Sequence, residues 1–169
     1  MFEATYGHVL AYALRRADRR DAEDIAAETY MIAWRRRSDI PPDPLPWLYA
    51  VARRTLANSR RSLRRRVRLG QRLAGEARSS PAMGADPAEQ LGEAMVIRAA
   101  LSALRESDRE ALMLVAWEGL SHEQASRVLA TTPQAFAVRL HRARRRLESQ
   151  IERRRREMPA QEPPETTDA

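Results

Sequence analysis

Apolar residues recur along this chain at intervals of three and four, which is the period of a helix with one buried face. No stretch alternates between apolar and polar residues over the length of a useful strand. The pattern therefore predicts an all-α fold. The expected helices cover residues 2–16, 22–36, 47–69, 91–104 and 107–118, with two more beginning after Ser121 and Thr132.

The apolar stripes also indicate which residues face a core. Trp34 and Tyr49 are interpreted as ordinary core residues. For Trp47, which starts a helix after a loop, a core role and a base-stacking role both stay open. The other expected core positions of the first half include Ile25, Thr29, Ile32 and Ala33 in one helix, and Leu48, Val51, Ala52, Thr55, Leu56 and Leu63 in the next.

Capping and breaking residues mark the ends of these helices. The stretch 38–46 is a proline-rich loop that no helix could cross, and Gly119 is expected to end a helix. The expected N-terminal signals are a capping Asp21, capping boxes at 107–110 and 121–124, and the pair Thr132–Pro133 with proline at the first helical position.

A small, polar stretch containing proline and glycine, 75–90, divides the chain. We expect two small helical domains, 1–72 and 91–155, joined by a flexible linker at 73–90. The proline- and glutamate-rich tail, 156–169, is expected to be disordered.

Composition narrows the classes of function. The 169 residues carry a net charge of +7, and every one of the 30 basic residues is arginine, which suits bidentate contact with phosphate and guanine. Cysteine is absent, so disulfides and thiolate metal sites are excluded. We expect no cofactor and no metal. With no signal peptide pattern and no apolar run long enough to span a bilayer, a cytoplasmic protein without membrane insertion is expected.

The second half has the pattern of a helix-turn-helix that reads DNA. Ala125 leaves room where two helices would cross. In the last helix Phe136, Leu140, Ala143, Leu147 and Ile151 form one apolar stripe, which leaves Gln134, Ala135, Val138, Arg139, His141, Arg142 and Arg145 on the exposed side. The alternative, a helical hairpin with a solvated basic face, is disfavoured by the capping signals, Ala125 and the Thr-Pro turn together.

The first half combines two surfaces of opposite charge. Ten arginines between Arg53 and Arg78 surround a single acid, Glu76, and this density is typical of contact with phosphates. The helix before them opens with Asp18, Asp21, Glu23, Asp24 and Glu28. Because an acidic face gains nothing from DNA, we expect it to dock on a protein partner.

Three stretches together resemble bacterial RNA polymerase sigma factors of the extracytoplasmic-function type, which belong to the sigma-70 family. They are DAEDIAAETYMIAWRR at 21–36, PWLYAVARRTLANSRRSLRRR at 46–66, and the half that runs from ALSALRESDREALMLVAWEGLSHEQASRVL to VRLHRARRRL within 100–147. The likeness extends over about residues 2–155 in the family's order.

The resemblance implies a promoter-specificity subunit and not an enzyme. The first domain would be sigma region 2, which docks on the β′ clamp helices of core RNA polymerase and holds a flipped base of the −10 element at the 38–46 loop. The second would be region 4, which reads the −35 element and meets the β flap. The implied partners are therefore core polymerase, double- and single-stranded promoter DNA and an anti-sigma factor.

The resemblance also carries residue roles. Asp21, Asp24, Ala27, Glu28, Met31 and Trp34 would bind core polymerase, and Trp47, Arg53, Arg54, Asn58 and Arg61 would lie along the −10 DNA. The −35 set would be Thr132, Gln134, Ala135, Val138, Arg139, His141, Arg142 and Arg145.

The chain departs from the family at two places. The recognition helix lacks the frequent Gly-Thr-Val-Lys/Arg-Ser start and has Gln134 to Val138 instead, so no −35 sequence is carried over and contact with thymine methyl groups is expected. Ala27 stands where glutamine is frequent.

Three other functions are alternatives to a promoter-specificity subunit. A stand-alone helix-turn-helix regulator lacks a dimerisation element and a sensor domain here. An enzyme lacks a catalytic constellation, because His8, His122 and His141 are scattered. A nonspecific basic scaffold would be supported by run-off transcription that initiates equally on every template.

Overall fold

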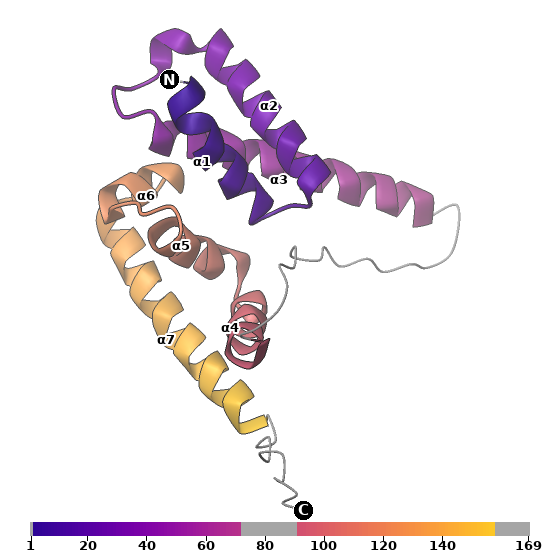
Figure 1. The fold of residues 1–169 in the computed structure, drawn as a ribbon, viewed down its shortest axis with the longest axis vertical. Coiled ribbons are helices and arrows are strands. Elements are labelled where there is room, and N and C mark those ends of the chain that lie inside the picture. The colour runs from indigo at the N-terminus through magenta and orange to yellow at the C-terminus, as the bar shows by residue number, and fades with distance from the viewer. Residues whose placement is uncertain (1, 72–90, 158–169) are drawn as a thin grey trace, which may run out of the picture.

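The structure is a computed structural model that describes residues 2–71 and 91–157, and all the regular structure in these ranges is helical (Figure 1). The elements in chain order are α1 (Phe2–Leu14), α2 (Arg19–Arg35), a 3-10 turn η1 (Arg37–Asp39), α3 (Leu45–Gln71), α4 (Leu91–Ala103), α5 (Glu106–Ala116), α6 (His122–Val128) and α7 (Pro133–Glu157). The all-α prediction is confirmed. The expected linker at 73–90 lies outside the described residues, and α7 continues two residues into the predicted tail.

The helices α1 to α3 form an N-terminal lobe around one core. Its fully enclosed side chains include Val9 and Tyr12 from α1, Ile25 from α2, and Leu48 and Tyr49 from α3. The rings of Tyr12 and Tyr49 stack with their centroids 5.0 Å apart. The core roles predicted for Tyr49 and for most of the two stripes are thus confirmed, with Ile32 partly buried.

Two core predictions in this lobe are wrong. Leu63 is 59% exposed and Trp34 is 74% exposed. Leu63 lies in the second half of α3, which runs past the ends of α1 and α2, so a helical stripe there meets no partner (Figure 1). Trp34 lies on α2 one position after the buried Ala33, and the helical turn of about 100° per residue carries it to the outer side.

Three predicted helix starts also need correction. The residue that caps α2 is Asp18, whose carboxylate accepts from the Asp21 backbone N–H at 2.9 Å, so Asp21 lies inside the first turn. Helix α3 begins at Leu45, before Pro46, because proline is tolerated in a first turn where its missing N–H has no helical acceptor. The expected box at 107–110 is absent, since α5 starts at Glu106 without a side-chain cap.

The helices α4 to α7 form a C-terminal lobe, and its predicted turns are confirmed. Ser121 and Gln124 make a reciprocal capping box on α6. Gly119 has a φ of +65°, a left-handed conformation that favours glycine. The Thr132 hydroxyl accepts from the Ala135 N–H at 3.2 Å, directly before Pro133 opens α7.

The stripe of α7 packs as the sequence predicts. Phe136, Leu140 and Ala143 are buried, while Leu147 and Ile151 are partly buried where the helix leaves the lobe. Ala125 of α6 has no exposed surface, consistent with a close helix crossing. Helices α6 and α7 thus form the expected helix-turn-helix.

The two lobes pack together where α3 meets α6, and they also share a largely buried group of charged residues. We call this group the inter-lobe ion cluster: Arg15 and Arg16 from the N-terminal lobe with Glu110 and Glu118 from the C-terminal lobe. Arg16 Nε lies 2.8 Å from Glu110 Oε2, and Arg16 Nη1 lies 3.0 Å from Glu118 Oε1. Arg15 also pairs with Glu118. Sequence patterns do not pair residues about a hundred positions apart, so this contact was not predicted.

Tyr12 of α1 also contacts the inter-lobe ion cluster. Its hydroxyl donates to Glu110 Oε1 at 2.8 Å, and its ring lies 3.6 Å from the Arg16 guanidinium carbon. Burial, together with the nearby carboxylate of Glu110, raises the pKa of Tyr12 well above its ordinary value. The phenol therefore stays protonated and keeps its role as a donor.

Truncation of Phe136 should destabilise the C-terminal lobe strongly. Phe136→Ala removes a fully buried ring and leaves a cavity, for an expected loss of about 3–5 kcal/mol in the free energy of unfolding. Val138→Ala is the matched control, because Val138 is half exposed on the same helix, and it should cost less than about 0.5 kcal/mol. Urea unfolding followed by circular dichroism measures both, and equal losses would contradict the assignment of the buried stripe.

Candidate functional site

The outer side of α2 carries an acidic and apolar surface. All six residues predicted to bind core polymerase are exposed: Asp21, Asp24, Ala27, Glu28, Met31 and Trp34. They recur at intervals of three and four residues, so they share one side of the helix, opposite the buried Ile25, Thr29 and Ala33. No ion pair involves Asp24 or Glu28 within the residues that the structure describes.

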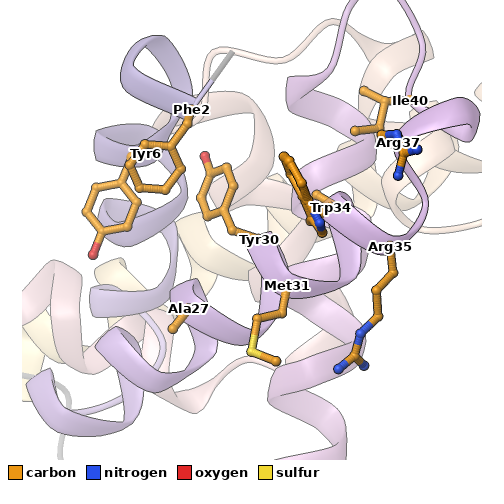
Figure 2. A pocket seen from close by; sticks show the side chains of 10 residues that line it. Phe2, Tyr6, Ala27, Tyr30, Met31, Trp34, Arg35, Arg37 and Ile40 are labelled. Carbon is orange, nitrogen blue, oxygen red and sulfur yellow. The ribbon is translucent and has the colours of Figure 1, made fainter.

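Beside this surface lies an apolar groove of about 960 Å³ between α1 and α2 (Figure 2). Phe2, Tyr6 and Tyr30 gather at one end, with ring centroids 4.8 to 5.8 Å apart, and Met31 and Trp34 lie farther along α2. The Tyr30 hydroxyl is 2.8 Å from that of Thr5, which holds the ring across the gap between the helices.

The groove widens the predicted docking surface. Phe2 and Met31 are each more than half exposed. An exposed apolar patch of this kind marks a contact with another macromolecule, and its acidic border favours a basic partner. Sequence reasoning missed the contribution of α1, although the aromatic residues Phe2 and Tyr6 at a four-residue spacing carried the signal.

The exposed side of α3 carries the residues predicted for the −10 element. Arg53, Arg54, Asn58 and Arg61 are all exposed, opposite the buried residues of the same helix. Arg61 Nη2 donates to Asn58 Oδ1 at 2.7 Å, so these two polar groups act as one unit. Arg64 and Arg65 extend the basic side, and the side chains of the later arginines lie outside the described part of the chain.

The structure leaves both interpretations of Trp47 open, as a core residue and as a residue that stacks on a base. It is partly buried and packs against the core, and the Arg36 guanidinium lies 5.8 Å from its ring centroid. Asp43, in the loop two residues before α3, accepts a hydrogen bond from Gln124 Nε2 of the C-terminal lobe at 2.9 Å.

The exposed side of α7 carries the residues predicted for the −35 element. Thr132, Gln134, Ala135, Val138, His141, Arg142 and Arg145 are exposed, and Arg139 is partly buried. Arg139 lines a cavity with the arginines of α3, so the structure brings one residue of the −35 set toward the −10 set. DNA binding by these two sets does not require that they lie close together, and no pattern in the sequence predicts this proximity.

The described residues contain neither a metal site nor a membrane-spanning helix. Among residues 2–71 and 91–157, no group of three or more His, Asp or Glu side chains could hold a metal ion. None of the described helices is long and apolar enough to span a lipid bilayer.

Comparison with known proteins agrees with this arrangement. Family models described as Sigma-70 region 2 and Sigma-70 region 4 match residues 1–66 and 94–147. The "Probable RNA polymerase sigma factor RfaY" of Xanthomonas campestris is 36% identical over 140 residues, which are 77% of this chain and 34% of that protein. The ECF RNA polymerase sigma factor SigM of Bacillus subtilis is 29% identical over 78% of this chain and 80% of its own length.

Solved structures share the fold. The sigma factor RpoE of Bartonella quintana, in complex with the anti-sigma factor NepR, has a TM-score of 0.67 at 24% identity, covering 89% of this chain and 94% of that one. CnrH, in complex with the cytosolic domain of CnrY, has a TM-score of 0.60 at 26% identity, covering 89% of this chain and 84% of that one. The chain spans about a third of RfaY, but it covers most of the length of the others. Together these matches place both lobes, in order, within one family: the chain belongs to the sigma-70 family and is an RNA polymerase sigma factor of the extracytoplasmic-function type.

Proposed function

We propose that this chain binds core RNA polymerase through the outer side of α2 and directs transcription initiation at promoters with −10 and −35 elements. The observation that carries the proposal is the exposure of six polymerase-binding candidates on one side of α2, beside an apolar groove. The subunit contributes binding and position, and the polymerase supplies the catalysis.

Docking on polymerase combines apolar burial with charge. Trp34 and Met31 present large apolar side chains to solvent, and their burial against the β′ clamp helices would supply the affinity. The exposed carboxylates of Asp24 and Glu28, which form no ion pair with the described residues, would meet basic residues, orient the partner and speed association. The groove extends the same surface toward α1.

The −10 element would lie along α3. Arg53, Arg54 and Arg61 are placed to contact successive phosphates, while Trp47 and the loop before it would receive an unstacked base. Unstacking costs a few kcal/mol per step, and pocket contacts together with polymerase binding would offset it.

The −35 element would be read by α7. The N-terminal turn at Thr132 presents backbone N–H groups suited to a phosphate, and Gln134, Ala135 and Val138 follow on the side that enters the major groove. Arg142 could make a bidentate contact with guanine. Holding both lobes on one polymerase, with the C-terminal lobe at the β flap, would raise their effective concentration on the promoter.

An anti-sigma factor is a further proposed partner. RpoE of Bartonella quintana was solved with such an inhibitor. In this chain the apolar groove beside α2 is the surface where an inhibitor would exclude polymerase most directly.

Replacing Trp34 should weaken polymerase binding. Trp34→Ala removes a large exposed apolar side chain, and a loss of about 2 kcal/mol, or roughly thirtyfold in Kd, is expected. Trp117→Ala is the matched control, because Trp117 is also an exposed tryptophan but lies in the C-terminal lobe after α5. Fluorescence anisotropy with labelled chain and purified core enzyme measures both, and equal Kd values for wild type and Trp34→Ala would remove the docking role.

Reversing a charge on α2 should also weaken polymerase binding. Asp24→Arg places a cation against a basic partner, so the Kd for core polymerase should rise by about tenfold or more while helicity stays unchanged. Glu148→Arg makes the same change on exposed α7 and should leave the Kd nearly unaltered. If both variants weaken binding equally, the effect is one of net charge and not of this surface.

Truncating Arg142 should impair promoter use without impairing assembly. Arg142→Ala is expected to lower −35-dependent initiation about tenfold, the value of one lost guanine contact, while polymerase binding is preserved. Arg144→Ala is the control, since this exposed arginine lies on the same helix nearer the buried stripe. Abortive initiation on matched templates with and without the −35 element measures the loss, and undiminished output from Arg142→Ala would exclude the contact.

A further inference from the structure

A second cavity, of about 590 Å³, lies between the two lobes. It is bordered by α1 and α3 on one side and by α5 and α7 on the other. Six arginines line it, five from the N-terminal lobe and one from the C-terminal lobe: Arg16, Arg53, Arg54, Arg60, Arg61 and Arg139. Two carboxylates, Glu106 and Glu110, share its wall.

The charges of this wall do not balance. Glu106 pairs with Arg60, and Glu110 pairs with Arg16 at 2.8 Å. Four arginines then have no carboxylate partner among the described residues: Arg53, Arg54 and Arg139 have no hydrogen bond from the side chain, and Arg61 donates only to neutral oxygens. Six arginines minus two glutamates leave a formal excess of four positive charges.

A buried donor at the same cavity is also unsatisfied. The Arg16 side chain is only 6% exposed, and its Nε and Nη1 have acceptors. Its Nη2 is buried and has no acceptor within residues 2–71 and 91–157. A buried charged donor without an acceptor is costly, so this nitrogen marks a place where an anionic oxygen would be stabilised.

The size of the cavity selects the kind of anion. Its volume lies within the range of about 300–1,000 Å³ that is usual for sites of small ligands. Taken as a sphere, a volume of 590 Å³ has a diameter of about 10 Å. A short chain of phosphates fits into a cavity of this size.

We propose that the inter-lobe cavity binds a compact polyphosphate, either inorganic or carried by a nucleotide. Arginine is suited to this ligand because its planar guanidinium makes paired hydrogen bonds to phosphate oxygens. The ligand would join Arg53 and Arg54 of α3 to Arg139 of α7, and so would bridge the lobes. Because these arginines are also candidates for DNA contact, the ligand and promoter DNA would exclude each other.

Calorimetric titration of the full chain with sodium tripolyphosphate tests the site. We expect saturable binding of one anion per chain at physiological ionic strength. Arg53→Ala/Arg54→Ala should weaken it by about tenfold or more, through the loss of charge-assisted hydrogen bonds. Arg139→Ala should weaken it about fivefold or more, since one contact from the other lobe is lost.

The control is Arg64→Ala/Arg65→Ala, which removes two exposed arginines of α3 that do not line the cavity and should leave the Kd nearly unchanged. Circular dichroism confirms that each variant folds. A parallel titration with GTP distinguishes a nucleotide source from an inorganic one, and binding of either supports the site. No saturable binding, several anions per chain, an unchanged Kd for Arg139→Ala, or equal weakening in the control would each overturn it. None of these results bears on polymerase binding, which is measured separately.

Discussion

The enclosure of Arg16 by groups from both lobes is the contact on which their arrangement depends. Its guanidinium lies on the ring of Tyr12 and pairs with Glu110 and Glu118, whose side chains are themselves largely buried. Burial alone would lower the pKa of Arg16, but Tyr12 and the two carboxylates outweigh it and raise the pKa. The cation is therefore stable in this position only while the second lobe supplies its counter-charges.

A buried ionic contact acts differently from the apolar contact that the lobes also share where α3 packs against α6. If the lobes part, Arg16 and Glu118 return to water and recover the hydration that burial removed, so the cost of separation is much lower than that of breaking the pair in place. Ile25 and Leu48 of one lobe and Phe136 and Leu140 of the other belong to one buried apolar cluster. The cost of separating the lobes therefore lies mainly in the apolar surface that they share, and less in the charged groups.

How far the sequence predicts this structure depends on the range of each interaction. Local signals succeeded: the capping box at Ser121, the glycine at 119 and the stripe of α7 are set by residues within a few positions of one another. A local signal was less accurate at the start of α2, where Asp18 and not Asp21 is the cap, and other failures depend on a more distant partner. Leu63 has an apolar stripe but no helix beside it, and Glu110 has the spacing of a capping box yet binds Arg16 instead. Trp34 follows the buried Ala33, and the residue pattern alone does not show where the buried side of α2 ends.

The same ion pairs determine which acids remain available to other molecules. The chain has a net charge of +7, so a carboxylate readily forms an ion pair with a neighbouring arginine. Glu106, Glu110 and Glu118 of the C-terminal lobe are all paired in this way. Within the described residues Asp24 and Glu28 have no such partner. The negative potential of these two carboxylates therefore extends into solvent, where it can orient a basic surface during association. The preference for a basic partner that we propose for the α2 surface rests on these two carboxylates, whereas Glu106, Glu110 and Glu118 are compensated by arginines of the N-terminal lobe.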